Sequence, residues 1–506
     1  MIKAPMPSSH IIPQCLSGSL ALGSDPLGDL YCTENSSGVR RDEGITLTPP
    51  PVVEWMVAHA QRRGKGVVRI VDGGAGTGRF TLAAAKAFPN AEIIAVEQNG
   101  ALAEILCRNV GALGLAKRVK IINGDFRDLA LPRIEGRTLF IGNPPYVRHH
   151  DIEPAWKHWY QTQMAGLGVK ASQLAGLHLH FFAKALSNAH AGDLVFFITA
   201  AEWLEVGYGK PLRDLILANT SIAEITLLDR EAQVFDDAMT TSTLTLLEVG
   251  TLSDGISFRT ADSIESLTHP NGFARFSFNE CSRAKRWTDL LHPGANDIGF
   301  AGALELGELF RVHRGQVTGM NSVWVEGHYN NPLPAGVCFS AITRARDLLA
   351  LPTARLRDAA LLRRVIDIPE DFTAFPEHER VQISNFLKWA QTHDAHRGYI
   401  ASHRKPWFHV NLRPPAPIVM TYMARRSPRF VRNVCEARLI NVAHGLYPRI
   451  PIPMRLLDTL TDWLNANVSV HSGRTYSGGL TKFEPGEVMR LKIPSLDEIR
   501  ILKAPG

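Results

Sequence analysis

Val67–Gly78 reads VVRIVDGGAGTG. The apolar run at its start predicts a buried strand that ends in the acid Asp72. A glycine-rich turn follows, and a helical pattern then runs from Arg79 to Phe88. Because glycines let a backbone approach a ligand closely, this strand, turn and helix predict a nucleotide-binding corner.

The spacing within the turn decides among possible ligands. A dinucleotide favours GxGxxG, and Gly74, Gly76 and Gly78 do not have that spacing. A P-loop needs a lysine, and none follows Gly78. Asp72 would repel a phosphate but suits the α-ammonium group of an amino-acid ligand such as S-adenosylmethionine. A dehydrogenase stays possible on this strand alone.

Two further predicted strands end in acids. The second strand ends at Glu97, where a carboxylate can accept hydrogen bonds from ribose hydroxyls. The third is followed by Asp125 and Phe126, which could bind the amino group and the ring of an adenine. Each acid alone could be a solvated carboxylate. Acids at successive strand ends beside a glycine turn instead favour a binding site for S-adenosylmethionine, which we call the donor site.

Asn143-Pro144-Pro145-Tyr146 follows a fourth apolar run, Thr138–Gly142. Two prolines remove backbone donors and fix φ, so this strand end is a rigid corner. The side-chain oxygen of Asn143 and the carbonyl of Pro144 can each accept one hydrogen of an amino group. Tyr146 offers a face for stacking on a flat base. Direct transfer of a methyl group from S-adenosylmethionine to that amino group would depend on positioning of the two molecules. It needs no cysteine nucleophile.

The pattern from about 45 to 250 alternates strand-like and helical segments, which predicts a mostly parallel α/β sheet covered on both faces. The predicted strands are Val67–Asp72, Glu92–Glu97, Val119–Ile122, Thr138–Gly142, Asp193–Thr199, Ile222–Leu228 and Thr243–Val249. The predicted helices are Pro51–Arg62, Thr81–Phe88, Leu102–Leu113, Leu177–His190 and Lys210–Ala218. We expect an irregular extension over 1–44, a catalytic domain over 45–250, a linker over 251–300 and a second domain over 301–506.

Composition agrees with a multidomain protein of a reducing compartment. A chain of 506 residues is too long to fold around a single hydrophobic core, so we expect more than one domain. Six cysteines are scattered without a CxxC pair, so we expect neither disulfides nor a metal site. No apolar run approaches the roughly 20 residues of a membrane span, and the N-terminus does not read as a signal peptide. We therefore expect a cytoplasmic protein.

The second half is basic and aromatic. The net charge of +6 permits an anionic partner. Between 401 and 449, arginines greatly outnumber acids and aromatic residues are interleaved, which is typical of a nucleic-acid surface. The candidates are Arg404, Trp407, Arg413, Arg425, Arg426 and Arg429. A solvated basic face is the alternative.

Together these motifs resemble the γ-class, Taq-type adenine-N6 DNA methyltransferases of restriction–modification systems. Thr48–Val57 is similar to that family's N-terminal TPP motif, and the glycine turn, the acids and the Asn-Pro-Pro-Tyr corner follow in family order. Gly207–Arg213 and Gln233-Val234-Phe235 resemble later motifs, the last with an aromatic ring that faces a flipped base. Arg311–Asn321 and Gly473–Leu480 resemble parts of the recognition domain.

The resemblance implies a Rossmann-like class I methyltransferase domain with a seven-stranded sheet, followed by a mixed α+β target-recognition domain. It implies that the protein binds S-adenosylmethionine and that Thr48 is one of the residues of that binding site. The expected reaction methylates N6 of an adenine flipped out of double-stranded DNA, with Phe235 as a second stacking residue. It further implies a separate cognate endonuclease and a monomer on DNA.

Other amino-methyltransferases also carry this corner. Cytosine-N4 enzymes usually have Ser in place of Asn143, and enzymes that methylate RNA or a protein glutamine lack a large basic C-terminal domain. A combined restriction–modification enzyme and a DNA-binding module with a relic donor site are the remaining alternatives. The recognition sequence cannot be extracted, because it depends on the groove positions of side chains.

Overall fold

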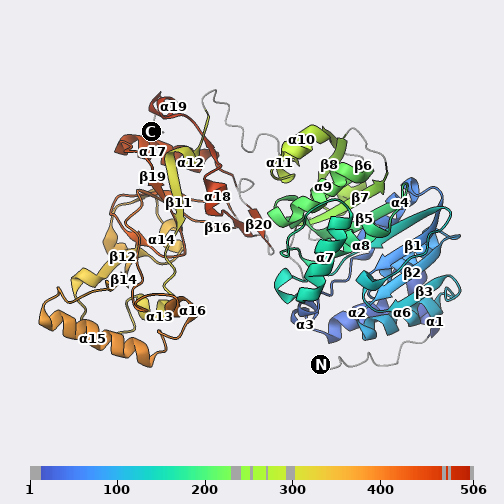
Figure 1. Cartoon of the computed structure of the whole chain (residues 1–506), viewed down its shortest axis with the longest axis horizontal. Coiled ribbons are helices and arrows are strands. Elements are labelled where there is room, and N and C mark those ends of the chain that lie inside the picture. The colour runs from blue at the N-terminus through green and yellow to red at the C-terminus, as the bar shows by residue number, and fades with distance from the viewer. Residues whose placement is uncertain are drawn as a thin grey trace. The chain divides into compact units, whose positions relative to one another are not determined.

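Figure 1 shows the computed structural model, which describes residues 13–228, 241–250, 255–268, 272–291, 303–424, 426–469, 474–476 and 480–501. The chain divides into two units. The first comprises Met1–His292 with Tyr476–Gly479, and the second comprises Pro293–Thr475 with Leu480–Gly506.

A nine-stranded sheet in the order β3-β2-β1-β4-β5-β7-β6-β8-β9 forms the first unit. Neighbours from β3 to β5 are parallel, and β7 is antiparallel to both β5 and β6. This confirms the predicted α/β fold. The strands are β1 (Val67–Gly73), β2 (Glu92–Glu97), β3 (Val119–Asn123), β4 (Arg137–Gly142), β5 (Leu194–Ala200), β6 (Thr220–Leu228), β7 (Ser242–Val249), β8 (Gly255–Ala261) and β9 (Ala274–Ser277).

The last two strands lie where a linker was predicted. β8 pairs in parallel with β6, and β9 pairs antiparallel with β8, so both extend the sheet of the first unit. Short helices α10 (Phe278–Arg283) and α11 (Thr288–Leu291) follow. Phe258 and Trp287 are fully buried in the core of this unit, which explains why the segment is ordered.

Helices cover both faces of the sheet because adjacent strand residues point to opposite faces. In β1, Ile70 packs with α4 (Pro50–Arg63), α5 (Arg79–Ala87) and α6 (Gly100–Ala112). Its neighbour Val71 packs with α7 (Pro154–Gly166), α8 (Leu177–Asn188) and α9 (Lys210–Asn219). Helix α7 was absent from the prediction.

The described part of the N-terminal extension is helical, although an irregular segment was predicted. It forms α1 (Pro13–Ala21), α2 (Pro26–Glu34) and α3 (Ser37–Asp42). Leu20, Leu27 and Tyr31 are buried against Leu102 and Ile105 of α6. This apolar contact gives the short helices a core and attaches them to the first unit.

The strand order has a switch point beside β1. The chain adds β2 and β3 on one side of β1 and then β4 and β5 on the other side. Ligands of open α/β sheets bind beyond the carboxyl ends of the strands at such a switch point. The glycine turn follows β1 at that edge, and the Asn143 corner follows β4. The topology therefore brings the two motifs together.

The second unit contains several smaller sheets. One sheet has the order β11-β19-β15-β17-β13, and another has the order β14-β12-β18. Their strands are β11 (Phe310–Arg314), β12 (Cys338–Ile342), β13 (Arg355–Leu356), β14 (Arg363–Ile366), β15 (Ile418–Met420), β17 (Phe430–Asn433), β18 (Arg438–Leu439) and β19 (His444–Pro448). The longest helices of this unit are α15 (Glu377–Thr392) and α17 (Met454–Asn467). Among the residues described in either unit, no helix is long and apolar enough to cross a membrane.

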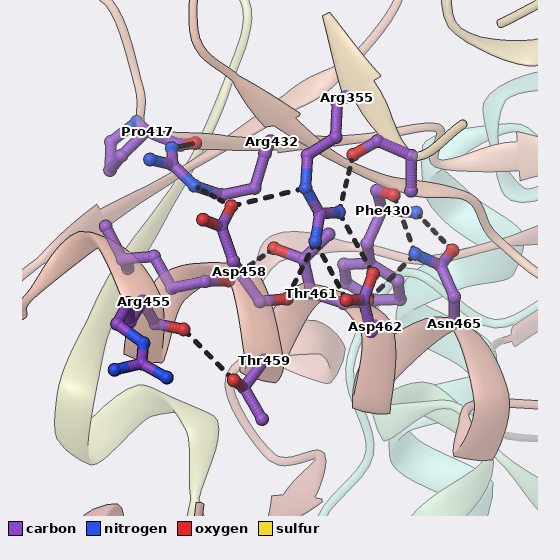
Figure 2. A network of polar contacts seen from close by, with 12 residues as sticks. Arg355, Pro417, Phe430, Arg432, Arg455, Asp458, Thr459, Thr461, Asp462 and Asn465 are labelled. Carbon is purple, nitrogen blue, oxygen red and sulfur yellow. Dashed lines mark hydrogen bonds and ion pairs between the residues drawn. The ribbon is translucent and has the colours of Figure 1, made fainter. Parts of the chain in front are cut away.

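A polar network fixes α17 to the larger sheet (Figure 2). Both terminal nitrogens of Arg355 donate to Asp462, at 2.9 and 2.8 Å, and Arg355 Nε lies 3.2 Å from Asp458. Asp458 also accepts from Arg432 at 3.1 Å. Asn465 exchanges two hydrogen bonds with the main chain of Phe430. Two arginines of the basic half are thus structural ion-pair partners.

Candidate active site

A cavity of about 360 Å³ lies at the carboxyl ends of β1 to β4. Most of the predicted donor-site and corner residues line it. These are Thr48, Gly74, Gly76, Glu97, Asp125, Phe126, Asn143 and Pro145. Among the described residues, Asp72, Gly78, Pro144 and Tyr146 are not part of its lining.

The glycine turn has the left-handed backbone that its composition suggests. Gly74, Gly76 and Gly78 have φ values of +73°, +57° and +95°. A Cβ on Gly78 would lie 2.4 Å from the end of the Leu106 side chain in α6, so a larger residue requires that side chain to move. Gly78 therefore serves the packing of the turn, whereas Gly74 and Gly76 present backbone to the cavity.

Glu97 connects the second strand to this turn. Its carboxylate accepts from the main-chain nitrogen of Gly76 at 2.7 Å and from that of Asn99 at 2.7 Å. Burial raises the pKa of Glu97, and these backbone hydrogen bonds oppose the rise. The carboxylate therefore lies on the cavity wall beside the turn, where it can accept from ribose hydroxyls.

Asp125 and Phe126 also line the cavity, and Asp125 pairs with Arg127, which was not predicted from the sequence. The Arg127 guanidinium binds Asp125 through Nε at 2.9 Å and Nη2 at 2.5 Å. It stacks 3.7 Å from the ring centre of Trp156 in α7. Phe126 lies over Gly73, where a Cβ would approach the ring to 2.8 Å. These hydrogen bonds fix the orientation of the Asp125 carboxylate.

Asp72, at the end of β1, is not among the described residues that line the cavity. It is buried, and its Oδ2 accepts from the hydroxyl of Thr81 in α5 at 2.6 Å. Burial raises its pKa to about 7, and the hydrogen bonds with Thr81 oppose that rise. Its Oδ1 has no hydrogen-bond partner among the described residues. The contact with Thr81 indicates that Asp72 holds the start of α5 in place.

The amide of Asn143 has a defined orientation. Its nitrogen donates to the main-chain carbonyl of Thr46 at 3.0 Å. A carbonyl can only accept, so the Asn143 amide must direct its nitrogen there and its oxygen elsewhere. Asn143 Oδ1 is buried and has no partner among the described residues. An acceptor on the cavity wall is thus available for an incoming donor.

Tyr146 lies next to this corner. The residue as a whole is partly exposed, while burial of the hydroxyl raises its pKa and a hydrogen bond with Ser242 opposes the rise. The main chain of Tyr146 donates to the carbonyl of Gly44 at 3.4 Å. Gly44 and Thr46 therefore hold the corner from the segment that precedes α4. Phe235, predicted as a second stacking residue, lies outside the described residues.

The predicted basic residues of the second unit have different environments. Arg404 donates to the carbonyls of Val317 and Thr318, and Arg429 donates to those of Leu349 and Leu351. Trp407 packs at a ring distance of 6.1 Å from the buried Trp324. Of the predicted residues, Arg413 and Arg426 are exposed. Arg425 lies outside the described residues.

The second unit brings another set of residues together with Arg413. Arg311 and Tyr447 are cross-strand partners, and the rings of His313 and Tyr447 lie 5.6 Å apart. Burial, Arg413 and Arg311 lower the pKa of His313. Arg311 and Arg413 are exposed, and no carboxylate pairs with either within the described part of the chain. We call Arg311, His313, Arg413 and Tyr447 the β11 patch.

Known proteins resemble this chain over most of its length. A type II methyltransferase, M.XamI of Xanthomonas campestris pv. amaranthicola, is 47% identical over 459 residues, covering 90% of this chain and 86% of the relative. The chain belongs to the type II DNA methyltransferases of restriction–modification systems. Its family implies S-adenosylmethionine as the methyl donor, and the glycine turn with the buried Glu97 fits that molecule.

Other comparisons agree with this family. Residues 132–235 match the Eco57I restriction-modification methylase family, and 357–504 match the C-terminal domain of type II methyltransferase M.Eco57I. M.AccI of Acinetobacter calcoaceticus is 23% identical over an alignment that covers 71% of this chain and 69% of M.AccI. The structure of the type IIL restriction-modification enzyme MmeI in complex with DNA has a TM-score of 0.52 at 12% identity. It covers 90% of this chain and 67% of MmeI and shows the similarity of fold.

Proposed function

We propose that this DNA methyltransferase modifies the N6 amino group of an adenine flipped out of double-stranded DNA. The observation that carries the proposal is the buried, unpartnered Oδ1 of Asn143 on the cavity wall, among the residues that the structure describes. An exocyclic amino group has two hydrogens to donate. Asn143 accepts one, and the main-chain carbonyl of Pro144 accepts the other.

These two acceptors would act on the substrate nitrogen. The N6 lone pair is delocalised into the ring, so the free amine is a poor nucleophile. Donation of both hydrogens to fixed acceptors favours a pyramidal nitrogen with a localised lone pair. S-adenosylmethionine supplies an electrophilic methyl group when bound. The protein's contribution is positioning and a polar environment that needs no rearrangement.

An adenine inside a duplex cannot reach this corner. Flipping it out costs a few kcal/mol of stacking and pairing free energy. We assign the replacement stacking surface to Tyr146, a partly exposed residue that follows the Asn143 corner. Phe235 is the proposed second ring.

The β11 patch is the surface that we assign to the DNA backbone. Arg311 and Arg413 are exposed arginines beside a half-buried tyrosine and histidine, and no carboxylate among the described residues neutralises them. Arg404 and Arg429 donate to main-chain carbonyls, so we assign them to the support of the second unit. Arg426 remains a candidate because it is exposed.

Methylation of another amino group is the alternative. A release factor glutamine methyltransferase of Bordetella pertussis is 32% identical over 111 residues, covering 22% of this chain and 40% of the relative. The corner alone does not distinguish adenine N6 from cytosine N4 or an amide, because other amino-methyltransferases also carry it. The discriminating experiment is transfer of radiolabelled methyl to unmethylated DNA, RNA and protein, followed by nucleoside and amino-acid analysis. Label in N6-methyladenine supports the proposal, and label only in N4-methylcytosine or glutamine contradicts it.

The proposal also includes a monomer that acts in the cytoplasm beside a separate cognate endonuclease. Sedimentation of the protein with and without a DNA duplex tests the monomer. A cleavage assay with magnesium and S-adenosylmethionine tests whether this chain itself cuts DNA.

A further inference from the structure

Asp25, which precedes α2, accepts more hydrogen bonds than a helix cap needs. It is 4% exposed, and its Oδ1 accepts from the main-chain nitrogen of Gly28 at 3.0 Å, which is the capping hydrogen bond. Three groups outside the helix also donate to its carboxylate. They are the hydroxyl of Thr77 at 2.5 Å, Arg79 Nε at 2.9 Å and Asn109 Nδ2 at 3.3 Å.

These partners belong to the donor site. Thr77 stands between Gly76 and Gly78 and lines the cavity, and Arg79 begins α5. Asn109 of α6 also donates to the main-chain carbonyl of Thr77 at 2.9 Å. Glu97 holds the nitrogen of Gly76 from one side. Asp25 and Asn109 hold the next residue from the other side.

Arg79 extends this network to the segment beside the Asn143 corner. Its Nη1 donates to the carbonyl of Thr48 at 3.0 Å, and its Nη2 pairs with Asp29 of α2 at 2.7 Å. Thr46 and Thr48 line the same cavity, and Thr46 accepts from Asn143. One buried carboxylate thus connects the N-terminal helices to two walls of the site.

We propose that Asp25 is a positioning residue for the methyl donor. A turn with glycines at Gly74, Gly76 and Gly78 has the largest conformational freedom that a backbone can have. Anchoring Thr77 and Arg79 restricts that freedom before the donor binds, so less binding free energy is spent on ordering the turn. The buried Asp25 carboxylate is therefore a support of the donor site.

The test compares Asp25→Asn with Asp29→Asn. Asparagine keeps an oxygen that can cap Gly28, but its amide nitrogen cannot accept from Thr77 or Arg79. Asp29 pairs with the same Arg79 and is exposed, so it is the matched control. The measurements are the Kd for S-adenosylmethionine and for S-adenosylhomocysteine by calorimetry, the Kd for DNA, and the melting temperature without ligand.

We expect Asp25→Asn to raise both donor-site Kd values about tenfold, which corresponds to about 1.4 kcal/mol. The Kd of Asp25→Asn for DNA should stay within about twofold of the wild-type value. Both donor-site Kd values of Asp29→Asn should also stay within about twofold of the wild type. A purely structural role would lower the melting temperature without selectively weakening the donor, and that result overturns the proposal.

A second pair of variants applies if Asp25→Asn does not fold. Thr77→Val removes the hydroxyl that donates to Asp25 while keeping the shape of the side chain, and Thr77→Ser retains it. The proposal is supported if Thr77→Val binds the donor more weakly than the wild type and Thr77→Ser does not. Equal binding by the two variants overturns it.

Discussion

The side-chain nitrogen of Asn143 donates to the main-chain carbonyl of Thr46 at 3.0 Å. These residues are far apart in the sequence, and the hydrogen bond joins the corner after β4 to the segment before α4. It leaves the Asn143 oxygen as an available acceptor on the cavity wall. The orientation of the proposed catalytic amide therefore depends on a segment outside the Asn-Pro-Pro-Tyr motif.

Asn143→Ala should strongly slow methyl transfer while the donor still binds. Removal of one preorganised hydrogen-bonding group in an active site costs roughly 10²- to 10³-fold in kcat. Because the donor cavity has many other lining residues, the Kd for S-adenosylmethionine should change by less than about threefold. Single-turnover methylation and calorimetry measure the two quantities. Loss of donor binding with a normally folded variant would contradict the assignment of this corner to the substrate.

Asn143→Asp provides a sharper control. A carboxylate oxygen cannot donate to the carbonyl of Thr46, so the variant lacks the hydrogen bond that orients the side chain. We expect transfer to fall by a similar factor although an acceptor is still present. Activity close to that of the wild type would show that the hydrogen bond to Thr46 is not needed.

The sheet and most of its helices were predictable from the sequence because buried parallel strands are continuous apolar runs. Helix α7 was not, since only Tyr160 and Met164 of its residues are buried and its apolar periodicity is weak. The helices at the N-terminus were missed because their Gly, Ser and Pro content resembles a loop. Asp25 followed by Pro26 was a capping signal that could have located α2.

The residues around the cavity were predictable by type, but the direction in which each side chain points was not. Strand-end acids are visible in a sequence, yet whether a carboxylate faces a cavity or a helix start depends on its rotamer, as Asp72 and Thr81 show. Charge patterning likewise cannot tell an arginine that binds main-chain carbonyls, such as Arg404, from an exposed one such as Arg413. Those distinctions arise from tertiary packing.

Substitution in the β11 patch should weaken DNA binding in a salt-dependent manner. For each phosphate that a protein ceases to neutralise, the slope of log K against log salt concentration becomes shallower by about 0.9. We expect Arg413→Ala to lower affinity for cognate and non-cognate duplexes alike and to reduce the slope by about 1. Fluorescence anisotropy at several salt concentrations provides the measurement.

Arg397→Ala is the control for this experiment, because Arg397 is also exposed in the second unit but pairs with Asp394. Its slope should match that of the wild type. Identical slopes for Arg397→Ala and Arg413→Ala would remove Arg413 from the DNA surface.

The network in Figure 2 should stabilise the second unit without affecting the donor site. A hydrogen-bonded charged pair contributes about 1.5–3 kcal/mol, and a partly exposed ion pair adds less than about 1 kcal/mol. Arg355→Ala removes the bidentate pairing with Asp462 and the ion pair with Asp458, so the free energy of unfolding should fall by about 2–3 kcal/mol. Arg500→Ala removes an exposed pair with Asp497 and should cost less than about 1 kcal/mol. Urea unfolding monitored by fluorescence compares them, and equal losses would contradict a stabilising network.

Asp72→Asn should change how the stability of the first unit depends on pH. Burial raises the pKa of Asp72 from 3.8 to about 7 in the folded protein. Between these two values the folded state binds the proton and the unfolded state does not, so the contribution of Asp72 to stability falls as pH rises. Above pH 7 both states are ionised, and the folded state bears the full cost of a buried charge.

Asparagine at this position cannot ionise and can still accept from the hydroxyl of Thr81. The difference in unfolding free energy, variant minus wild type, should therefore increase from pH 5 to pH 8 by an amount on the order of 1 kcal/mol or more. Urea unfolding of both proteins at these two pH values measures the difference. A difference that is independent of pH would mean that Asp72 is already ionised in the folded protein at pH 5.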